Sequence, residues 1–258
     1  MAVLVLLGCA AILLPLILTL YLSVFDEQMI VFPPRGYTFA WYGQIAAKFG
    51  GAIWTSLRIA IAAVALSLAV GIPAGIGLSR HHFRGRDALA TFLLSPLTIP
   101  GIAVGLAIYV LAILIEERTG VELAGSIRLL ILAHLLLTMP WVVRLCLASL
   151  TNHERTTEEA AASLGANPMM VIWRVTLPAM RPGIVAAGLF AFIISFENLE
   201  INLFLVAPGM TTLPVSVLNY LSYHTDPLVA AVAVAQMVVV GAALLAMDRL
   251  VKIGQVLQ

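Results

Sequence analysis

Six long apolar runs constrain this chain more than any other feature of its sequence. A membrane-spanning helix needs about 20 consecutive, mainly apolar residues. The stretches that meet this length are residues 2–25, 53–79, 88–115, 128–150, 183–206 and 228–250. Only 10% of the 258 residues are charged, whereas soluble domains carry roughly a quarter. The sequence therefore predicts an all-α polytopic membrane protein with six transmembrane helices.

The first run, residues 2–25, resembles a secretory signal peptide only superficially. It has no basic n-region, and its apolar core is longer than the roughly 7–15 residues of such a segment. We therefore expect it to be retained as the first transmembrane helix. The missing basic residues also lead us to expect that native residues precede Met1.

Lysine and arginine divide unevenly between the two sides of the predicted bundle, and cytoplasmic loops carry an excess of both. Of the 14, nine lie with the loops after the second and fourth helices and the C-terminus: Arg80, Arg84, Arg86, Arg144, Arg155, Arg174, Arg181, Arg249 and Lys252. The other five are Arg35, Lys48, Arg58, Arg118 and Arg128, and eight of the 13 acidic residues lie on their side. We therefore predict that both termini are cytoplasmic.

Small residues and prolines recur within the apolar runs. Helices in lipid associate through close packing of small residues, so we interpret two glycine pairs as packing contacts: Gly71 with Gly75, and Gly101 with Gly105. Four prolines are expected to interrupt the second, third and fourth helices: Pro73, Pro96, Pro100 and Pro140. Such breaks fit a transport path, but proline kinks are also common in helices that conduct nothing.

The polar segment 151–182, between the fourth and fifth runs, is predicted to begin with a short helix. Thr156 and Glu159 have the spacing of a capping box, and Glu158 adds negative charge near the helix start. Gly165 stands where a left-handed C-terminal cap is expected. The alanines between them present little bulk, so another protein could approach the backbone closely.

A second short helix is predicted in the same segment. Asn167 and Pro168 are typical of an N-cap and a first helical residue. We expect Pro178 to end this helix before the fifth apolar run. Considered physically, the segment is either a docking loop or an amphipathic loop that lies on the membrane surface.

The segment resembles the Glu-Ala-Ala loop of the membrane subunits of binding-protein-dependent ABC importers. That pattern is E-A-A, three residues, G, nine residues and I-x-L-P, and residues 159–161, Gly165 and 175–178 match it with Val175 in place of Ile. The resemblance extends from Thr55 to near Met247. It implies a type I ABC importer permease fold, with residues 1–51 as the first helix and an outer-side loop and residues 52–250 as the transmembrane core.

The resemblance also implies a role for the loop, because the family's first loop helix docks into a cleft of the ATPase. The residues implied are Glu158, Glu159, Ala160, Ala161, Leu164, Gly165, Ala166, Pro168, Leu177 and Pro178. The implied partners are an ABC ATPase dimer, a second permease subunit, an extracytoplasmic solute-binding protein and membrane lipid, with no nucleic acid. The implied location is the inner membrane of a prokaryotic cell.

No nucleotide site is predicted in this chain. Its two lysines, Lys48 and Lys252, do not follow a glycine, so the G-x-x-x-x-G-K-[ST] phosphate loop is missing. ATP and Mg²⁺ are therefore expected on a partner ATPase, and this chain is expected to be a non-catalytic permease without a cofactor. The alternatives are an ion-coupled secondary transporter, which predicts inverted repeats, and a polytopic membrane enzyme.

The histidines suggest neither a metal site nor a catalytic one. His81 and His82 lie in a short basic loop without cysteine or paired carboxylates, which we interpret as interfacial. His134 lies within an apolar run, and we interpret it as a core histidine with satisfied hydrogen bonds rather than a proton relay. We predict no catalytic residues and no metal.

Carboxylates near the end of the fifth run are the candidates for a solute path. Such residues in an apolar helix usually face the bundle interior or water, and the set is Glu197, Asn198, Glu200 and Asn202. The alternative is that the helix has already reached the outer interface there. Residues 195–198, 207–209 and 212–214 are similar to the spermidine/putrescine branch, although that branch usually has a second acid at Asn198 and a glycine at Ala207. Together with the acidic outer side, this similarity predicts a polyamine or similar cation as solute.

Overall fold

The computed structural model describes residues 1–29, 31–151 and 155–251, and in these residues the chain is helical apart from turns and two isolated β-bridges. The long helices are α1 (Ala2–Leu22), α2 (Ala40–Arg80), α4 (Gly101–Thr119), α5 (Ile127–Thr151), α9 (Arg181–Phe196) and α12 (Leu228–Val251). The short ones are α3 (Arg86–Leu94), η1 (Ser95–Thr98), α6 (Thr156–Ser163), α7 (Pro168–Val171), η2 (Ile172–Thr176), α8 (Leu177–Ala179), α10 (Asn202–Leu205) and α11 (Leu213–Leu221).

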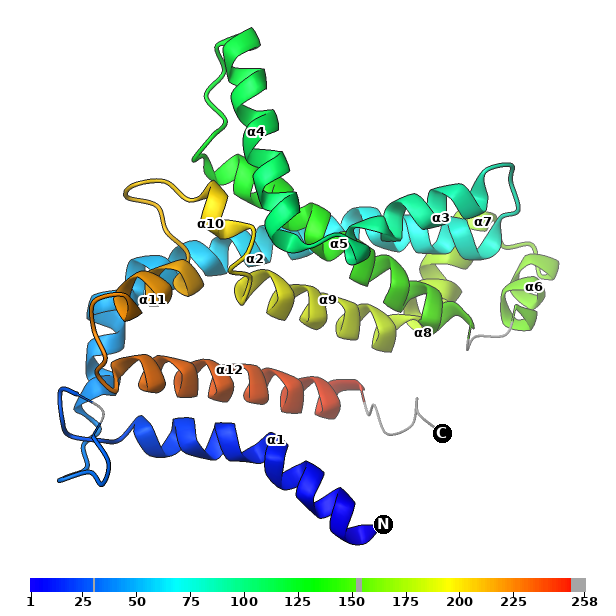
Figure 1. Ribbon diagram of the computed structural model, residues 1–258. Helices are drawn as coiled ribbons and strands as arrows, with labels where there is room; N and C mark the ends of the chain where they lie inside the picture. The colour runs from blue at the N-terminus through cyan, green and yellow to red at the C-terminus, as the bar shows by residue number, and fades with distance from the viewer. Residues whose placement is uncertain (30, 152–154, 252–258) are drawn as a thin grey trace.

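Helices α2, α5 and α9 form the centre of the bundle, with α12 and then α1 packed to one side (Figure 1). Glycines allow α2 and α5 to approach closely. A Cβ atom added to Gly71 would lie 2.7 Å from Val142 Cγ1, and one added to Gly75 would lie 2.9 Å from Cys146 Cβ. These distances are too short for side chains, so the packing interpretation of this glycine pair is confirmed.

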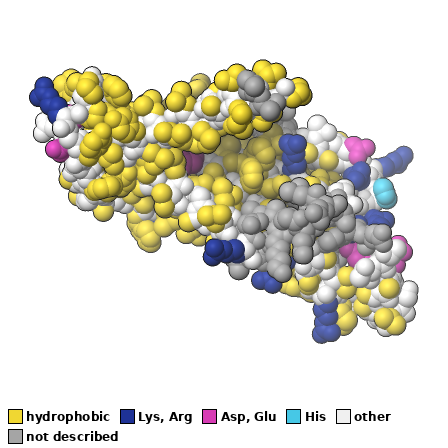
Figure 2. All heavy atoms as spheres, turned by 90° about the horizontal axis from the view of Figure 1, so that it is seen from below, with side chains coloured by type: hydrophobic (Ala, Val, Ile, Leu, Met, Phe, Trp, Pro, Cys, Tyr) yellow, Lys and Arg dark blue, Asp and Glu magenta, His cyan; other side chains and the backbone are white. Residues whose placement is uncertain are grey.

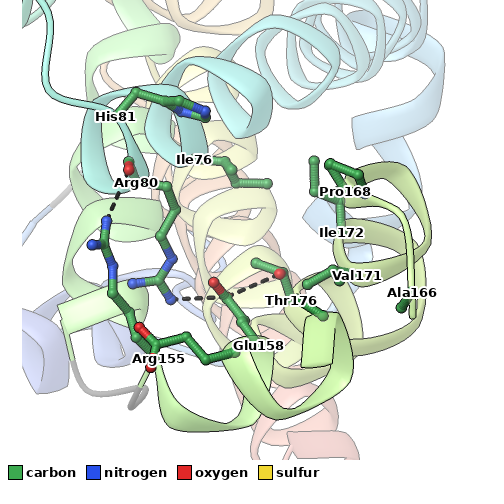
Figure 3. Close-up of a pocket in the computed structure, with 12 residues that line it drawn as sticks. Ile76, Arg80, His81, Arg155, Glu158, Ala166, Pro168, Val171, Ile172 and Thr176 are labelled. Carbon is green, nitrogen blue, oxygen red and sulfur yellow. Dashed lines mark hydrogen bonds and ion pairs between the residues drawn. The ribbon is translucent and has the colours of Figure 1, made fainter. Parts of the chain in front are cut away.

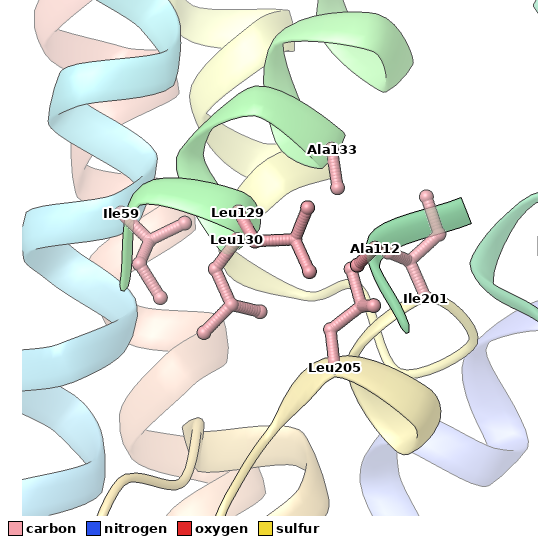
Figure 4. Packing of buried hydrophobic residues seen from close by; sticks show 7 residues of the cluster. All are labelled: Ile59, Ala112, Leu129, Leu130, Ala133, Ile201 and Leu205. Atoms are coloured by element: carbon pink, nitrogen blue, oxygen red, sulfur yellow. The ribbon is translucent and has the colours of Figure 1, made fainter. Parts of the chain in front are cut away.

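A cluster of buried apolar side chains ties α4 and α10 to this centre. It consists of Ile59, Ala112, Leu129, Leu130, Ala133, Ile201 and Leu205, which Figure 4 shows facing one another from α2, α4, α5 and the α10 region. Gly105 allows the contact between α4 and the α10 region, because a Cβ atom there would lie 3.0 Å from Ile201 Cα. Small residues therefore set the spacing at both ends of the bundle.

Among the described residues, four helices are long and apolar enough to cross a membrane, and the number reaches six if each of two bent helix pairs counts as one span. The predicted polytopic helical fold is thus confirmed. The second helix begins at Ala40 instead of residue 53, so it has 41 residues. Its length of about 61 Å exceeds the roughly 30 Å of a hydrocarbon core.

The third predicted span, 88–115, is interrupted, as predicted for Pro96 and Pro100. The segment Arg86–Thr98 meets α4 at an angle of 104°, and α4 projects away from the bundle (Figure 1). The break falls at Ile99, whose extended backbone (φ −97°, ψ 133°) is the conformation that a following proline favours. Pro73 and Pro140 lie inside continuous helices, so neither proline ends its helix.

The fifth predicted span, 183–206, is likewise divided. Helix α9 ends at Phe196, and α10 begins at Asn202. Between them Asn198 Oδ1 accepts a hydrogen bond from the Ile201 N–H at 3.0 Å. This is the bond that an N-cap side chain makes to the N–H three residues on, so Asn198 begins the path of the chain into α10. We call residues 197–201 the α9–α10 turn.

The start of α1, the end of α12 and helix α6 lie at the same end of the bundle (Figure 1). This is the grouping that the predicted topology requires. Figure 2 shows Lys and Arg side chains gathered over this end, while the rest of that face is largely apolar. Which side of the membrane this end faces stays a prediction.

Candidate coupling loop and solute path

Helix α6 begins one residue earlier than the capping box requires. Thr156 is its first helical residue, and Arg155 stands at the N-cap position without capping the helix through its side chain. The Arg155 guanidinium instead donates to the carbonyl oxygens of Ser79 at 3.3 Å and Arg80 at 2.8 Å. The predicted register is therefore wrong, because a contact with the end of α2 positions the start of α6.

The predicted cap at the other end of α6 is confirmed. Gly165 has φ +90°, its N–H donates to Ala162 O at 2.9 Å, and the Ala166 N–H donates to Ala161 O at 3.1 Å. This pair of bonds is a Schellman motif, in which glycine tolerates the left-handed backbone. A Cβ atom at Gly165 would meet no atom within 4 Å, so the space beside it is open.

The second short helix begins as predicted but continues past its predicted end. Asn167 Oδ1 caps α7 by accepting the Met170 N–H at 2.8 Å. The chain then passes through the π-helix η2 and through Pro178, and it bends by 69° only at Met180. Pro178 therefore does not end the helix. The wider π-turn directly before this residue accommodates a proline that donates no hydrogen bond.

A cavity of about 320 Å³ separates α6 from the end of α2 (Figure 3). On its wall the Arg80 guanidinium donates to Glu158 Oε1 at 2.9 Å, and Thr176 Oγ1 donates to the same oxygen at 2.9 Å. The side chains of Arg80 and Glu158 are only 13% and 19% exposed. Glu158 thus joins α2, α6 and η2, and we call these three residues the Glu158 junction.

The rest of the loop presents apolar surface outward. Leu164 is 90% exposed, Trp173 66% and Met169 61%. Glu159 and Ala160 are also exposed, so within the described residues the two glutamates of the loop differ in environment. Exposed apolar side chains with a polar rim are typical of a surface that binds another protein.

The second candidate site is a cavity of about 500 Å³ between the two broken regions. The α9–α10 turn contributes Glu197, Asn198 and Glu200, and the α3–α4 break contributes Pro96 and Gly101, among other residues. Asn202, the fourth predicted residue, does not line this cavity. It is buried, with 1% exposure.

Both carboxylates of this cavity are positioned by other helices. Glu197 accepts hydrogen bonds from Gln236 Nε2 of α12, at 3.1 Å to Oε1 and 3.3 Å to Oε2. Glu200 lies against Gly101, the first residue of α4, where any Cβ atom would overlap Glu200 Oε2. This glycine of the predicted packing pair therefore makes room for a carboxylate at the positive end of a helix.

His134 is a core histidine, as predicted. It is 1% exposed, and its ring nitrogens bond to Ser195 Oγ at 2.7 Å and Asn202 Oδ1 at 3.0 Å. Sequence reasoning missed Ser195, which is 61 residues away and has no local signal. Within the described residues, no three His, Cys, Asp or Glu side chains are grouped to hold a metal ion.

Comparisons with known proteins agree with this architecture. Residues 67–253 match the family described as "Binding-protein-dependent transport system inner membrane component". The putrescine transport system permease protein PotI of Escherichia coli (strain K12) is 30% identical over 234 residues, which cover 90% of this chain and 83% of that protein. The molybdenum transport system permease protein ModB of Mycobacterium bovis is 34% identical over 206 residues, or 75% of each chain.

A solved structure gives the same fold. A chain of a bacterial ABC transporter involved in the import of the acidic polysaccharide alginate aligns with a TM-score of 0.69, over 96% of this chain and 94% of that one. The two chains are 18% identical, so this likeness concerns the fold alone.

Proposed function

Because this chain belongs to the family of binding-protein-dependent transport system inner membrane components, and is thus a non-catalytic permease subunit of an ABC importer, we propose that its solute is a small cation, with a polyamine as the best fit. The family implies a separate ATPase and a solute-binding protein as partners. Relatives are named for putrescine and for molybdenum, so membership alone leaves the solute open.

One observation carries the cation proposal. Glu197 and Glu200 line a cavity whose lining includes no lysine or arginine among the described residues. Two carboxylates in such a cavity attract a cation and repel an anion. Trp141 lines the same cavity, and an aromatic ring adds cation–π attraction for an ammonium group.

The test is uptake by the complete complex in liposomes with its binding protein. We expect Glu197→Gln and Glu200→Gln each to lower putrescine or spermidine uptake while ATPase assembly is unchanged. Glu117→Gln is the matched control, because Glu117 is exposed and lies outside the cavity. Undiminished uptake by the Glu197→Gln/Glu200→Gln double variant, or an anionic solute, would refute the assignment.

The coupling loop is the second part of the proposal. Ala160, Ala161, Leu164 and Gly165 contact the ATPase, and α6 faces the cytoplasm together with both termini. A second, homologous permease subunit completes the path. The exposed apolar surface at Leu164 and Trp173 favours this role over that of a loop lying on lipid, since Glu159 and Ala160 beside it are also exposed.

Thiol labelling tests this orientation. With Cys9 replaced by serine, cysteines at Arg84 and Ala162 should react with an impermeant reagent only from the cytoplasm, and one at Glu117 only from outside. Labelling of the Ala162 variant in intact cells would contradict the predicted orientation of the chain in the membrane.

A further inference from the structure

His134 lies in α5 between the two ends of the α9–α10 turn. Ser195, in the last turn of α9, bonds to its Nδ1, and Asn202, the first residue of α10, bonds to its Nε2. The three side chains are between 1% and 2% exposed. One imidazole ring thus fastens both ends of the turn to the same helix.

The hydrogen bonds assign the tautomer of this ring. Asn202 Nδ2 donates to the carbonyl oxygen of Asn198 at 2.6 Å, so its Oδ1 is the atom that faces His134. An amide oxygen only accepts, so Nε2 of His134 carries the proton and Nδ1 accepts from the Ser195 hydroxyl. The neutral ring therefore satisfies both partners at once.

The chain of bonds continues into the turn itself. Asn198 is held by Asn202 through its carbonyl, and its own side chain holds the Ile201 N–H at 3.0 Å. The residues between these anchors include Glu197 and Glu200, the carboxylates of the cavity. Backbone bonds also enter the turn, from the Asn198 N–H to Ser195 O at 3.4 Å and from the Leu203 N–H to Leu199 O at 3.0 Å, and the side-chain bonds add to them in fixing its shape.

We infer that His134 is a positioning residue for solute recognition, which sets the place of Glu197 and Glu200 by fixing the α9–α10 turn to α5. This role rests on the proposed solute path. It does not require that His134 touch the solute, and His134 does not line the cavity.

Two amide substitutions separate the two bonds of the ring. The Asn amide lies near the position of Nδ1, so His134→Asn keeps a partner for Ser195 and loses Asn202. The Gln amide reaches the position of Nε2, so His134→Gln keeps Asn202 and loses Ser195. Because Asn202 is the residue that holds Asn198, His134→Asn should disturb the turn more.

The matched control is Thr138→Val. Thr138 is fully buried one turn from His134 in α5. Its hydroxyl donates to the backbone carbonyl of His134 at 2.7 Å and bonds to Ser67 Oγ at 2.6 Å, so it contacts neither the His134 ring nor the turn through these bonds. We expect His134→Asn to raise the KM for uptake about tenfold with kcat little changed, since an unsatisfied buried polar group has an effect of this size. His134→Gln should raise KM less, and Thr138→Val should leave it unchanged. Equal effects of His134→Asn and Thr138→Val would refute positioning by His134.

A reporter that needs no solute separates this inference from the cation proposal. Leu199 lines the cavity within the turn, and the reaction rate of Leu199→Cys with a water-soluble thiol reagent measures the turn's position. Cys9 and Cys146 are replaced first. We expect His134→Asn to change this rate severalfold and Thr138→Val to leave it unchanged. Unchanged labelling in His134→Asn would overturn the inference, whereas unimpaired uptake by the Glu197→Gln/Glu200→Gln double variant would overturn only the cation proposal.

Discussion

The coupling loop and the α9–α10 turn are held together in different ways. The loop's form comes from bonds between neighbours in sequence, such as Ala166 to Ala161 and Met170 to Asn167. The turn also has local bonds at Asn198, but distant residues fasten it to the bundle. His134 lies 61 residues from Ser195 and 68 from Asn202, and Gln236 lies 39 residues from Glu197. A segment shaped by local bonds keeps its form when it moves, whereas a segment shaped by distant bonds changes form when its neighbours move.

This difference fits the different functions proposed for the two segments. A docking element must keep its shape while a partner displaces it, and a solute site must change shape as the surrounding helices shift. Two contacts of the loop are exceptions: the Glu158 junction, because Arg80 lies 78 residues from Glu158, and Arg155, which bonds to carbonyl oxygens 75 and 76 residues away. They are the points at which a locally folded unit is attached to the bundle.

The largest effect is expected from Gly165→Trp. The side chain would enter open space, and the left-handed backbone would add only about 1–2 kcal/mol of strain, so the protein should still insert. Close approach of the ATPase should be blocked and uptake abolished. Gly120→Trp is the matched control, since Gly120 also has positive φ and open space but follows α4. If Gly165→Trp takes up solute at the native rate, the proposed docking role of this loop is wrong.

A smaller loss is expected when the Glu158 junction is reversed. Arg80→Glu places two carboxylates together and should lower uptake about tenfold, since one buried polar group without its partner costs about 1–3 kcal/mol. The double variant Arg80→Glu/Glu158→Arg should recover much of the activity. If ATP hydrolysis continues while uptake stops in the single variant, the junction transmits motion. If the double variant recovers nothing, the contact is not the cause.

At the turn, Gly101→Ala should have a moderate effect. The new methyl group would overlap Glu200 Oε2 and displace the carboxylate, at a cost of about 1–3 kcal/mol if the side chain cannot move freely. Uptake KM should rise severalfold. Gly77→Ala in α2 is the control, because a Cβ atom there meets nothing within 4 Å. Equal uptake by the two variants would show that uptake does not depend on the position of the Glu200 carboxylate.

The smallest effect belongs to the cap of α7. Asn167→Ala removes the bond to the Met170 N–H and should cost about 1 kcal/mol. Hydrogen exchange at Met170 should quicken about fivefold, and Asn167→Asp should restore protection. Because this bond is local, uptake should fall little. A large loss of uptake would mean that the loop depends on more than its own short-range bonds.

The sequence predicted what local patterns determine. The left-handed Gly165 and the Asn167 cap depend on residues no more than four positions away, and both are confirmed. The six apolar runs predicted the membrane fold because length and hydropathy decide it. The helix start predicted from the capping box was wrong by one residue, because the Arg155 side chain bonds to carbonyl oxygens at the end of α2. No local sequence pattern encodes this contact.

The division of the fifth span was missed for a related reason. Apolar composition continues through 183–206, so hydropathy gives no sign of the turn after Phe196, whereas Pro96 and Pro100 did indicate the break at Ile99. Whether a proline breaks a helix depends on the packing around it, as the intact α2 at Pro73 demonstrates. The partners of Glu197 and Asn202 likewise emerge only when α5 and α12 are in place.

Helix α2 has a mechanical consequence. Near its first turns Trp41 Nε1 donates to Phe25 O and Lys48 to Tyr220 OH, and at its last residue Arg80 holds Glu158. Its 41 residues form one continuous helix between these attachments, and Figure 1 shows its first turns set at an angle to the rest. A displacement applied at α6 is therefore carried along a single helix as far as this bend. The neighbouring helices are divided instead, where α3 meets α4 and where α9 meets α10.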